Sequence, residues 1–441
     1  MLLRSADGRS LRLRRTLRWR TARIVVFFFC LFNLLEVLWI HDKLASGDQQ
    51  RMSLTGRPHQ RIYIASMHFN NGDMLRNHWN DAVIRLTEEF GSANVFVSIL
   101  ESGSWDDSKE LLRGLAKELE RRGVPHRVEI SDVTHHDEIA KEDKGVGWID
   151  TPRKRRELRR ITYLAKLRNK TIQDLLDLSE KGTSFDKVLF LNDVVFTTED
   201  VLKLLNTNGG DYGAACSLDF SKPPQYYDTF ALRDAEGNGH AMQTWPYLGA
   251  RLSRNALVNH LDAVPVMSCW NGIGMAGRIL PTPGPDSPHT LRETDKQAKP
   301  FACLVAMPAE PFVSSTRLRF RGISDSLAAY HLEGSECCLI HADNPLSKSL
   351  GVYINPRVRV GYNLAAYEAT HRGAAWVSAW GIFEGLWLNR IRRWTKFTLD
   401  RVVVNRRVKR WEEEQAGNHE LGKFCLINEM QVLADNGWAH V

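Results

Sequence analysis

The sequence lacks the features that mark several common protein classes. Its seven cysteines in 441 residues are too few for a disulfide scaffold, and no Cys-x-x-Cys pair or Cys/His cluster is present, so we expect no structural zinc. No internal repeat is evident. An excess of positive charge is also absent beyond the N-terminus, because the net charge is +7 and eight arginines fall within residues 1–23. A nucleic-acid binder is therefore a poor interpretation of the basic isoelectric point.

What is present is a globular composition and one long apolar run. The chain is 43% hydrophobic and 25% charged, and its length suits one large domain or two smaller ones. The run Ile24–Ile40 has 17 residues and is interrupted by Asn33 and Glu36. It lies near the lower limit for a membrane-spanning helix, roughly 17–25 residues. Glu36 must lie near the membrane interface or find a partner.

The arginines that precede the run predict its orientation. By the positive-inside rule the N-terminus is cytosolic, and residues from 42 onward lie on the far side of the membrane. The alternative is a cleaved signal peptide, whose apolar region is usually about 7–15 residues long. No small-x-small cleavage site follows closely. We therefore predict an uncleaved signal anchor over residues 24–41, after a basic tail over 1–23 and before a polar stem over 42–60.

An oxidising compartment allows one or two disulfides in the region beyond the anchor. The sequence does not give the pairing among the six cysteines of this region, which are Cys216, Cys269, Cys303, Cys337, Cys338 and Cys425. One glycosylation sequon occurs, at Asn169–Thr171.

From residue 61 the pattern predicts alternating strands and helices. Strands are expected at 62–65, 94–100 and 128–130, with helices opening near Asp73 and at Asp106 or Asp107. A βαβαβ order of this kind implies a parallel sheet with helices on both faces, hence an α/β fold. Ligands of such sheets bind beyond the carboxyl ends of the strands.

The stretch Lys187–Phe196 (KVLFLNDVVF) carries the strongest chemical signal. Val188–Leu191 reads as a short buried strand, and Asn192 and Asp193 then interrupt the apolar run. An acid at the end of a buried strand is costly unless it is paired or binds a cation. In nucleotide-sugar transferases an acidic motif at such a strand end holds a divalent metal against a diphosphate. The alternative is that both residues cap a turn or the following helix.

A predicted helix over residues 157–178 places Arg168 on its apolar stripe, with Asn169 at the border. A guanidinium on an inward face needs an anionic partner. That partner can be a carboxylate of the protein or the diphosphate of a nucleotide, which arginine grips through its planar fork. The local pattern gives both alternatives similar weight.

Three later segments are less specific. Residues 223–237 mix aromatic and polar side chains, which suits a sugar site or an ordinary packed loop. Residues 335–343 place an acid, a histidine and a second acid around one expected buried strand, where His341 is a structural residue or a metal ligand. Residues 376–411 are amphipathic and basic, which predicts a C-terminal helical pair over the core; a membrane-surface helix is the less favoured alternative.

Several motifs together resemble one family. Eight segments occur in its order, namely 62–65 (IYIA), 97–104 (VSILESGS), 163–169 (YLAKLRN), 190–194 (FLNDV), 216–220 (CSLDF), 227–234 (YDTFALRD), 268–272 (SCWNG) and 335–339 (SECCL). This set resembles the fungal capsule-associated, cryptococcal-type α-1,3-mannosyltransferase family over about residues 60–365. The resemblance implies type II membrane proteins of the secretory pathway, a GT-A-like fold, GDP-mannose as donor and retention at the anomeric carbon.

The resemblance also implies roles for single residues. Asp193, helped by Asn192 and with His341 as a candidate ligand, would hold Mn²⁺ or Mg²⁺ on the diphosphate. Arg168 would add a second cation, and Asn169 would contact the nucleotide. Retention needs a carboxylate nucleophile or same-face attack guided by the leaving phosphate. The candidate carboxylates near the sugar are Asp219, Asp228, Asp234 and Glu336, and Trp270 and Asn271 would shape the acceptor side.

The expected architecture is a GT-A-like, Rossmann-type mixed sheet flanked by helices over residues 61–365, with a helical extension over 366–441. The motif Asn-Asp-Val at 192–194 lacks one acid of the usual Asp-x-Asp pair. The alternative function is therefore a catalytically silent, membrane-anchored scaffold of a glycan or capsule assembly complex. The expected partners are a nucleotide sugar, a glycan acceptor and the membrane of the Golgi or ER.

Overall fold

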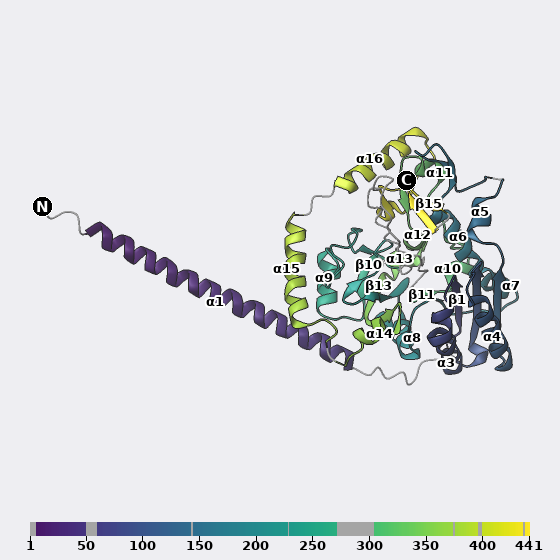
Figure 1. Ribbon diagram of the computed structural model, residues 1–441, viewed down its shortest axis with the longest axis horizontal. Helices are drawn as coiled ribbons and strands as arrows, with labels where there is room; N and C mark the ends of the chain where they lie inside the picture. Colours follow the sequence, from purple (N-terminus) through teal and green to yellow (C-terminus); the bar gives the residue numbers. More distant parts are fainter. Residues whose placement is uncertain are drawn as a thin grey trace, which may run out of the picture.

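The computed structural model describes residues 6–49, 60–142, 144–227, 229–270, 304–373, 375–395, 399–434 and 437–441. Within these ranges the chain forms one large sheet covered by helices, and the long helix α1 (Ala6–Gln49) projects from it (Figure 1). Part of α1, Trp19–Gly47, is long and apolar enough to cross a membrane. The predicted class, a mixed α/β sheet flanked by helices and preceded by an apolar helix, is confirmed.

The sheet is parallel on one side and mixed on the other. Strands β3, β2, β1 and β6 are parallel, as the βαβαβ pattern predicted, and β11 lies antiparallel between β6 and β7. The order across the sheet is β3 (His126–Ser131), β2 (Val95–Ser102), β1 (Ile62–His68), β6 (Lys187–Leu191), β11 (Leu304–Pro308), β7 (Ala214–Lys222), β13 (Val352–Gly361), β10 (Val264–Ser268) and β9 (Arg233–Asp234), with β8 (Gln225–Tyr226) on β7.

Helices flank the sheet in chain order. They are α2 (Gly72–Met74), the π-helix η1 (Leu75–Trp79), α3 (Asn80–Phe90), α4 (Ser108–Arg121), α5 (His135–Ile139), α6 (Arg160–Thr171), α7 (Gln173–Glu180), α8 (Thr198–Leu205), α9 (Arg251–Val258), α10 (Glu310–Val313), α11 (Asp325–Ala328), α12 (Glu336–Asp343), α13 (Leu346–Ser349), α14 (Leu364–Thr370), α15 (Ala379–Thr395) and α16 (Leu399–Glu414). Short 3₁₀ turns are η2 (Ser92–Asn94), η3 (Thr207–Gly210) and η5 (Lys423–Cys425), and small strand pairs are β4 (Trp148–Asp150) with β5 (Arg156–Leu158), β12 (Glu333–Gly334) with β14 (Leu426–Ile427), and β15 (Gln431–Ala434) with β16 (Gly437–His440).

Both faces of the sheet are buried, and the alternation of side chains along β1 shows how. Ile62 and Ile64 belong to a core built with helices α3, α4 and α8. Tyr63 and Ala65 face the other way, into a core that includes residues of α6 and α7. Successive side chains of a strand point to opposite faces, so a strand covered on both sides is apolar throughout.

Two expected elements are wrong. The helix predicted over 157–178 is divided at Ile172 into α6 and α7, preceded by β5. Residues 335–343 do not surround a strand: they form α12, whose residues Glu336–His341 are all buried. A short run that is buried on every side carries no helical period, so the pattern alone does not separate strand from helix. The Ser335 hydroxyl accepts a hydrogen bond from the Cys337 N–H and caps the helix.

Helix α1 runs through the first part of the predicted stem, to Gln49, and residues 50–59 lie outside the described residues. Two disulfides form among the six candidate cysteines, Cys216–Cys269 and Cys338–Cys425, which confirms the expected number. The predicted C-terminal helical pair is also confirmed, as α15 and α16.

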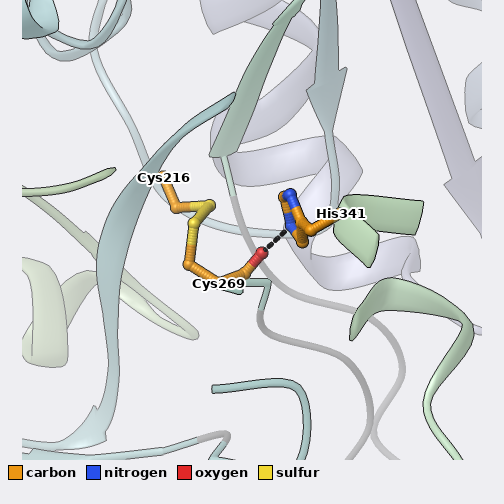
Figure 2. Close-up of side chains that lie close together, drawn as sticks. All are labelled: Cys216, Cys269 and His341. Carbon is orange, nitrogen blue, oxygen red and sulfur yellow. Dashed lines mark hydrogen bonds between the residues drawn. A yellow bond between two sulfur atoms is a disulfide. The ribbon is translucent and has the colours of Figure 1, made fainter. Parts of the chain in front are cut away.

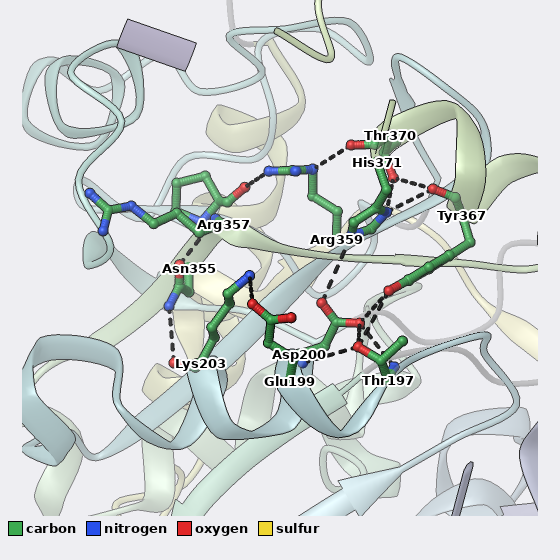
Figure 3. A network of polar contacts seen from close by, with 11 residues as sticks. Thr197, Glu199, Asp200, Lys203, Asn355, Arg357, Arg359, Tyr367, Thr370 and His371 are labelled. Carbon is green, nitrogen blue, oxygen red and sulfur yellow. Dashed lines mark hydrogen bonds and ion pairs between the residues drawn. The ribbon is translucent and has the colours of Figure 1, made fainter. Parts of the chain in front are cut away.

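A polar network fastens the chain that follows β6 (Figure 3). Buried Asp200 on α8 accepts hydrogen bonds from the Thr197 N–H and hydroxyl at 2.9 and 2.7 Å and from the Tyr367 hydroxyl at 2.7 Å. The ring of His371 lies 3.8 Å from its other oxygen. The network ties α8 to α14. The loop between β6 and α8 is therefore held at one end by the sheet and at the other by this network.

Candidate active site

Asp193 lies just beyond the carboxyl end of β6 and is buried. Its Oδ2 accepts a hydrogen bond from the Asn71 side-chain amide at 3.0 Å. Its Oδ1 has no hydrogen-bond partner among the described residues, although it is shielded from solvent. Burial raises the pKa of Asp193 well above its usual range, and its own backbone N–H, Asn71 and the charge of Arg168 offset only part of this effect. A carboxylate with one orphaned oxygen is a ready acceptor for a cation or a donor group.

Asn192 precedes it and is buried as well. The Asn192 carbonyl accepts a hydrogen bond from the Trp79 indole N–H at 2.9 Å. The Asn192 side-chain nitrogen has no partner within the part of the chain that the structure describes. Two neighbouring buried side chains thus each keep one unsatisfied polar atom, which is unusual for a purely structural turn.

The loops after β1 and β2 lock together beside Asp193. The Asn71 N–H donates to the Ser108 hydroxyl at 2.8 Å, and the Asn70 N–H donates to the Ser104 hydroxyl at 2.8 Å. The Gly72 N–H donates to Asp106 at 2.9 Å. A Cβ on Gly72 would lie 2.0 Å from an oxygen of Asp107, so a larger residue here would displace the Asp107 side chain. These bonds hold the Asn71 amide in place for Asp193.

Arg168 lies on the other side of the site and is buried. It donates from Nε to Glu336 at 3.0 Å. Its guanidinium lies 5.1 Å from the centre of the Trp270 ring and 5.8 Å from that of Phe320. Of the two partners expected for Arg168, a protein carboxylate or a diphosphate, the carboxylate is present: it is Glu336, one of the candidate catalytic residues. Because the charge of Arg168 also acts on Asp193, the three groups belong to one electrostatic cluster.

The other predicted site residues lie in different surroundings. Asp234 accepts backbone N–H bonds from Glu236, Asn238 and Ala250, so both of its oxygens hold a turn. Asp219 is buried on β7, where its charge acts on Tyr247. Asn169 exchanges two hydrogen bonds with the Phe320 backbone, at 2.8 and 2.9 Å. Asp228 and Asn271 lie outside the described residues.

Comparison with known families identifies the family of the chain. A family model described as "Cryptococcal mannosyltransferase 1" matches residues 61–343, which is more than half of the chain. The chain belongs to this family. No curated protein sequence matches the chain significantly.

The solved structures that resemble it are distant. One is "Mannosyltransferase PcManGT from Pyrobaculum calidifontis in complex with GDP-Man and Mn2+", with 8% identity and a TM-score of 0.29, covering 77% of this chain and 67% of that one. Another is S. aureus TarS (residues 1–349) in complex with UDP, with 8% identity and a TM-score of 0.31, over 75% of this chain and 65% of that one. A third is GalNAc-T7 with UDP, GalNAc and Mn2+, with 12% identity and a TM-score of 0.33, over 71% and 47%. The chain thus spans about two thirds or less of these proteins, and the similarity is too low to assign any residue.

The metal ligands expected in this mannosyltransferase family are only partly assembled in the described residues. Asp193 offers one orphaned oxygen, which fits a single carboxylate ligand. The one group of three His, Cys, Asp or Glu ligand atoms found within 4.8 Å of each other there is Cys216, Cys269 and His341. Its cysteines form a disulfide and offer no thiolate, and His341 Nε2 lies 2.5 Å from the Cys269 carbonyl (Figure 2). The metal role of His341 stays a prediction.

Sequence reasoning missed the partners of Asp193 and the aromatic groups nearby. Asn71 and Trp79 carry no signal beyond lying near the predicted turn after β1. His68, at the end of β1, packs its ring 4.3 Å from Trp79, and burial lowers the pKa of His68 to about 4. Phe69, Trp105 and His135 gather where β1, β2 and β3 end, with ring centres 5.1 to 6.1 Å apart. Only their common place at the carboxyl ends of parallel strands could have linked them.

Proposed function

We propose that this member of the mannosyltransferase family transfers mannose from GDP-mannose to a glycan acceptor with retention, making an α-1,3 linkage. The observation that carries the proposal is Asp193: a buried acid with one orphaned oxygen, within the electrostatic reach of Arg168, at the carboxyl edge of a parallel sheet. Ionisable groups with perturbed pKa values gather at functional sites more than elsewhere. The family match supports the sugar chemistry.

In this proposal Asp193 and Arg168 act on the donor diphosphate. Mn²⁺ or Mg²⁺ bound at Asp193 Oδ1 would offset the charge that develops on the leaving GDP. Hard divalent ions of this size keep several waters and take one or two protein carboxylates together with substrate phosphates, so a single acid is enough. Arg168 is oriented by Glu336 and by the faces of Trp270 and Phe320. Asn192 would donate its free amide hydrogens to the nucleotide.

The nucleobase would lie against the aromatic group at the ends of β1 to β3. Phe69 and Trp105 meet edge to face, and Trp105 is largely exposed, so one ring face is accessible to a flat ligand. The Phe69 N–H donates to the Asn71 side chain, which also contacts Asp193. Base and diphosphate sites would therefore be joined through one short loop.

Among the candidate carboxylates, the geometry favours Glu336 for a role near the sugar. It belongs to the same cluster as Asp193, through Arg168. Asp234 has both oxygens committed to backbone N–H groups, so we propose a structural role for it. Asp219 and Asp228 stay candidates for stabilising positive charge at the anomeric carbon, and the Asn169 contact with nucleotide also stays a prediction.

We further propose that the chain is a single-pass type II protein with its catalytic region in the Golgi or ER lumen. The apolar part of α1 supports a membrane anchor, and the two disulfides support an oxidising compartment. Eight arginines before the apolar run support a cytosolic N-terminus.

The test is GDP release from GDP-mannose by the full chain purified in detergent, with and without Mn²⁺. Wild-type protein should turn over, and Asp193→Asn should lose at least about a hundredfold, because a metal or diphosphate contact supplies several kcal/mol. Asp200→Asn, another buried aspartate on the same stretch, is the matched control and should retain its turnover per folded molecule. Equal turnover in wild type and Asp193→Asn would contradict the role of Asp193.

The scaffold alternative has its own signature. It is motivated by the missing second acid of the motif and by the absence of Asp193 from any three-ligand group among the described residues. A scaffold would neither release GDP nor bind it in calorimetry, while cellular function would survive Asp193→Asn. GDP binding that is lost in Asp193→Asn would argue for the enzyme even where the acceptor is unknown.

A further inference from the structure

The two polar residues inside the apolar run of α1 both have partners on α15. The Trp387 indole N–H donates to Asn33 Oδ1 at 2.6 Å, and Arg390 pairs with Glu36 at 2.5 Å. The Phe29 ring packs against Trp387 at 5.4 Å. Toward the C-terminal end of α1, Val37, Ile40 and Leu44 are buried, and their spacing puts them on one face of the helix. The anchor helix is therefore docked on the globular part over residues 33–44 (Figure 1).

Helix α15 is itself fixed to the globular part. The Asn389 side chain donates to the Leu248 carbonyl at 3.0 Å. A Cβ on Gly385 would lie 2.1 Å from the Trp245 carbonyl oxygen, so the two backbones touch. At the end of α1, Gly47 packs equally closely on His260. The end of α1 and helix α15 thus both contact the globular part.

This docking conflicts with an anchor that crosses the bilayer alone. The apolar part that precedes the polar contacts, Ile24–Phe32, is about 14 Å long at 1.5 Å per residue, whereas a hydrocarbon core is about 30 Å thick. The span must therefore include residues 33–40, which add about 12 Å. These are the residues that contact α15. Any membrane that α1 crosses must reach α15.

The exposed face of α15 is suited to that environment. Trp380 and Trp394, near its two ends, are each 70% exposed, and Leu388 and Ile391 are exposed between them. Glu384 is the one exposed acid on the helix. Tryptophan at both ends of an apolar face is typical of a helix at a membrane interface.

Arginines of α9 and α15 lie close enough for their charges to act on one another. The pKa of Arg254 is lowered by burial and then by the charges of Arg393, Arg251 and Arg390, with Glu236 the opposing charge. Arg254 donates to the Gly249 carbonyl and Arg393 to the Asn389 side chain, neither of which is anionic. Arg390 already pairs with Glu36, which leaves Arg251, Arg254 and Arg393 as the cations of this group that repel one another. Phospholipid headgroups offer phosphate at the depth where an interfacial helix lies.

We propose that α15 lies in the far leaflet of the bilayer beside α1, with Arg251 and Arg254 binding lipid phosphate, so that the catalytic domain is held against the membrane. The proposal rests on α1 being an uncleaved anchor. It replaces a domain on a flexible stem with one whose distance and tilt from the membrane are fixed. A sugar acceptor would then be met at a set height above the membrane surface.

The test uses nitroxide labels on the full chain in nanodiscs of phosphatidylcholine with phosphatidylserine. One cysteine at a time replaces Ile391 on α15, Val402 on α16 or Phe28 on α1, all of which are exposed, in a background with Cys30→Ser and Cys303→Ser that keeps the buried Cys337 and the two disulfides. Accessibility to oxygen relative to a water-soluble nickel complex should be several-fold higher for the Ile391→Cys and Phe28→Cys labels than for the Val402→Cys label. An Ile391→Cys label that matches Val402→Cys, beside a lipid-exposed Phe28→Cys label, would overturn the proposal and leave the anchor intact. Water exposure of the Phe28→Cys label would overturn both.

A second variant tests the arginines from an element that is neither α1 nor α15. Arg251→Gln with Arg254→Gln, both on α9, should lower the oxygen-to-nickel ratio of the Ile391→Cys label and leave that of the Phe28→Cys label unchanged. The matched control is Arg406→Gln with Lys409→Gln on α16, which removes the same charge elsewhere. An equal effect of both pairs, or none from the α9 pair, would contradict phosphate binding by these arginines.

Discussion

Asp193 and Asp200 are buried aspartates seven residues apart, and their surroundings are opposite. Asp200 accepts three hydrogen bonds and faces His371 (Figure 3). Burial raises the pKa of Asp200, but His371, Tyr367 and Thr197 outweigh this effect and the pKa is lowered. Asp193 accepts a side-chain hydrogen bond from Asn71, and its pKa is raised. The protein environment therefore stabilises the ionised form of Asp200. It destabilises the ionised form of Asp193 unless a ligand is bound.

The two acids thus differ in whether the protein itself satisfies the carboxylate. A buried carboxylate whose oxygens accept hydrogen bonds stabilises the native state. A buried carboxylate with an unpaired oxygen does not, and its presence suggests a role in binding or catalysis. Asp234 falls with Asp200 on this criterion, because three backbone N–H groups use both its oxygens. Glu336 lies between the two classes, since its one side-chain cation, Arg168, itself faces the site.

The largest expected effect concerns that intermediate case. Arg168→Met should lower the free energy of unfolding by about 3–5 kcal/mol, because it leaves Glu336 buried and unpaired. Chemical denaturation followed by fluorescence measures it. The double variant Arg168→Met with Glu336→Leu should recover most of the loss, since it removes both charges. If the double variant were as unstable as the single one, the pair would not be the cause.

The comparison of Asp193 with Asp200 predicts that their asparagine variants change the free energy of unfolding differently. Asp200→Asn should lower the free energy of unfolding by about 1–3 kcal/mol, because it removes the negative charge that faces His371 and that strengthens the hydrogen bonds from Thr197 and Tyr367. Asp193→Asn should leave it unchanged or raise it by about 1 kcal/mol, because it removes a charge that is costly to bury. Both are measured by denaturation without metal or nucleotide. A loss in Asp193→Asn as large as that in Asp200→Asn would erase the distinction.

The pH dependence of these variants sharpens the same point. The folded pKa of Asp200 is lowered, so its stabilisation is present above the unfolded pKa of about 3.9 and is lost as the pH falls through the folded value. The folded pKa of Asp193 is raised, so wild-type stability falls as the pH rises from about 4 toward the folded value. The difference in free energy of unfolding between wild type and Asp200→Asn should therefore decrease in acid. The corresponding difference for Asp193→Asn should increase toward neutral pH, with wild type the less stable protein.

The smallest expected effect concerns glycosylation of Asn169, which we predict does not occur. Asn169 lies in the sequon, but its side chain exchanges two hydrogen bonds with Phe320, and the Thr171 hydroxyl donates to the Arg168 carbonyl. A glycan on Asn169 would break the first two bonds beside Arg168. Peptide mass spectrometry of protein from the secretory pathway should find Asn169 unmodified. A glycan there in active protein would rule out both its structural contact and its predicted place near the nucleotide.

The sequence predicted the strand end that carries the site better than the side-chain pairs that form there. The end of β6 was clear because four apolar residues precede Asn192 and Asp193. The need of Arg168 for an anion was also clear, but its partner Glu336 lies 168 positions away, and no local pattern encodes such a pair. The same holds for Glu36 and Arg390, which are 354 positions apart. Helix α12 was taken for a strand because all of its faces are buried, which leaves no period to detect.

The disulfide Cys338–Cys425 sets an order on how the protein is made. Glu336 lies two residues before Cys338, on the helix that faces Arg168, and this helix is joined to a segment near the C-terminal end. Synthesis proceeds from the N-terminus at about 5–20 residues per second, so the parallel strands can pair long before Cys425 is available. The covalent bond that holds the helix of Glu336 closes only after that. A chain that stops before Cys425 can therefore form the sheet but not the covalent bond that holds this helix.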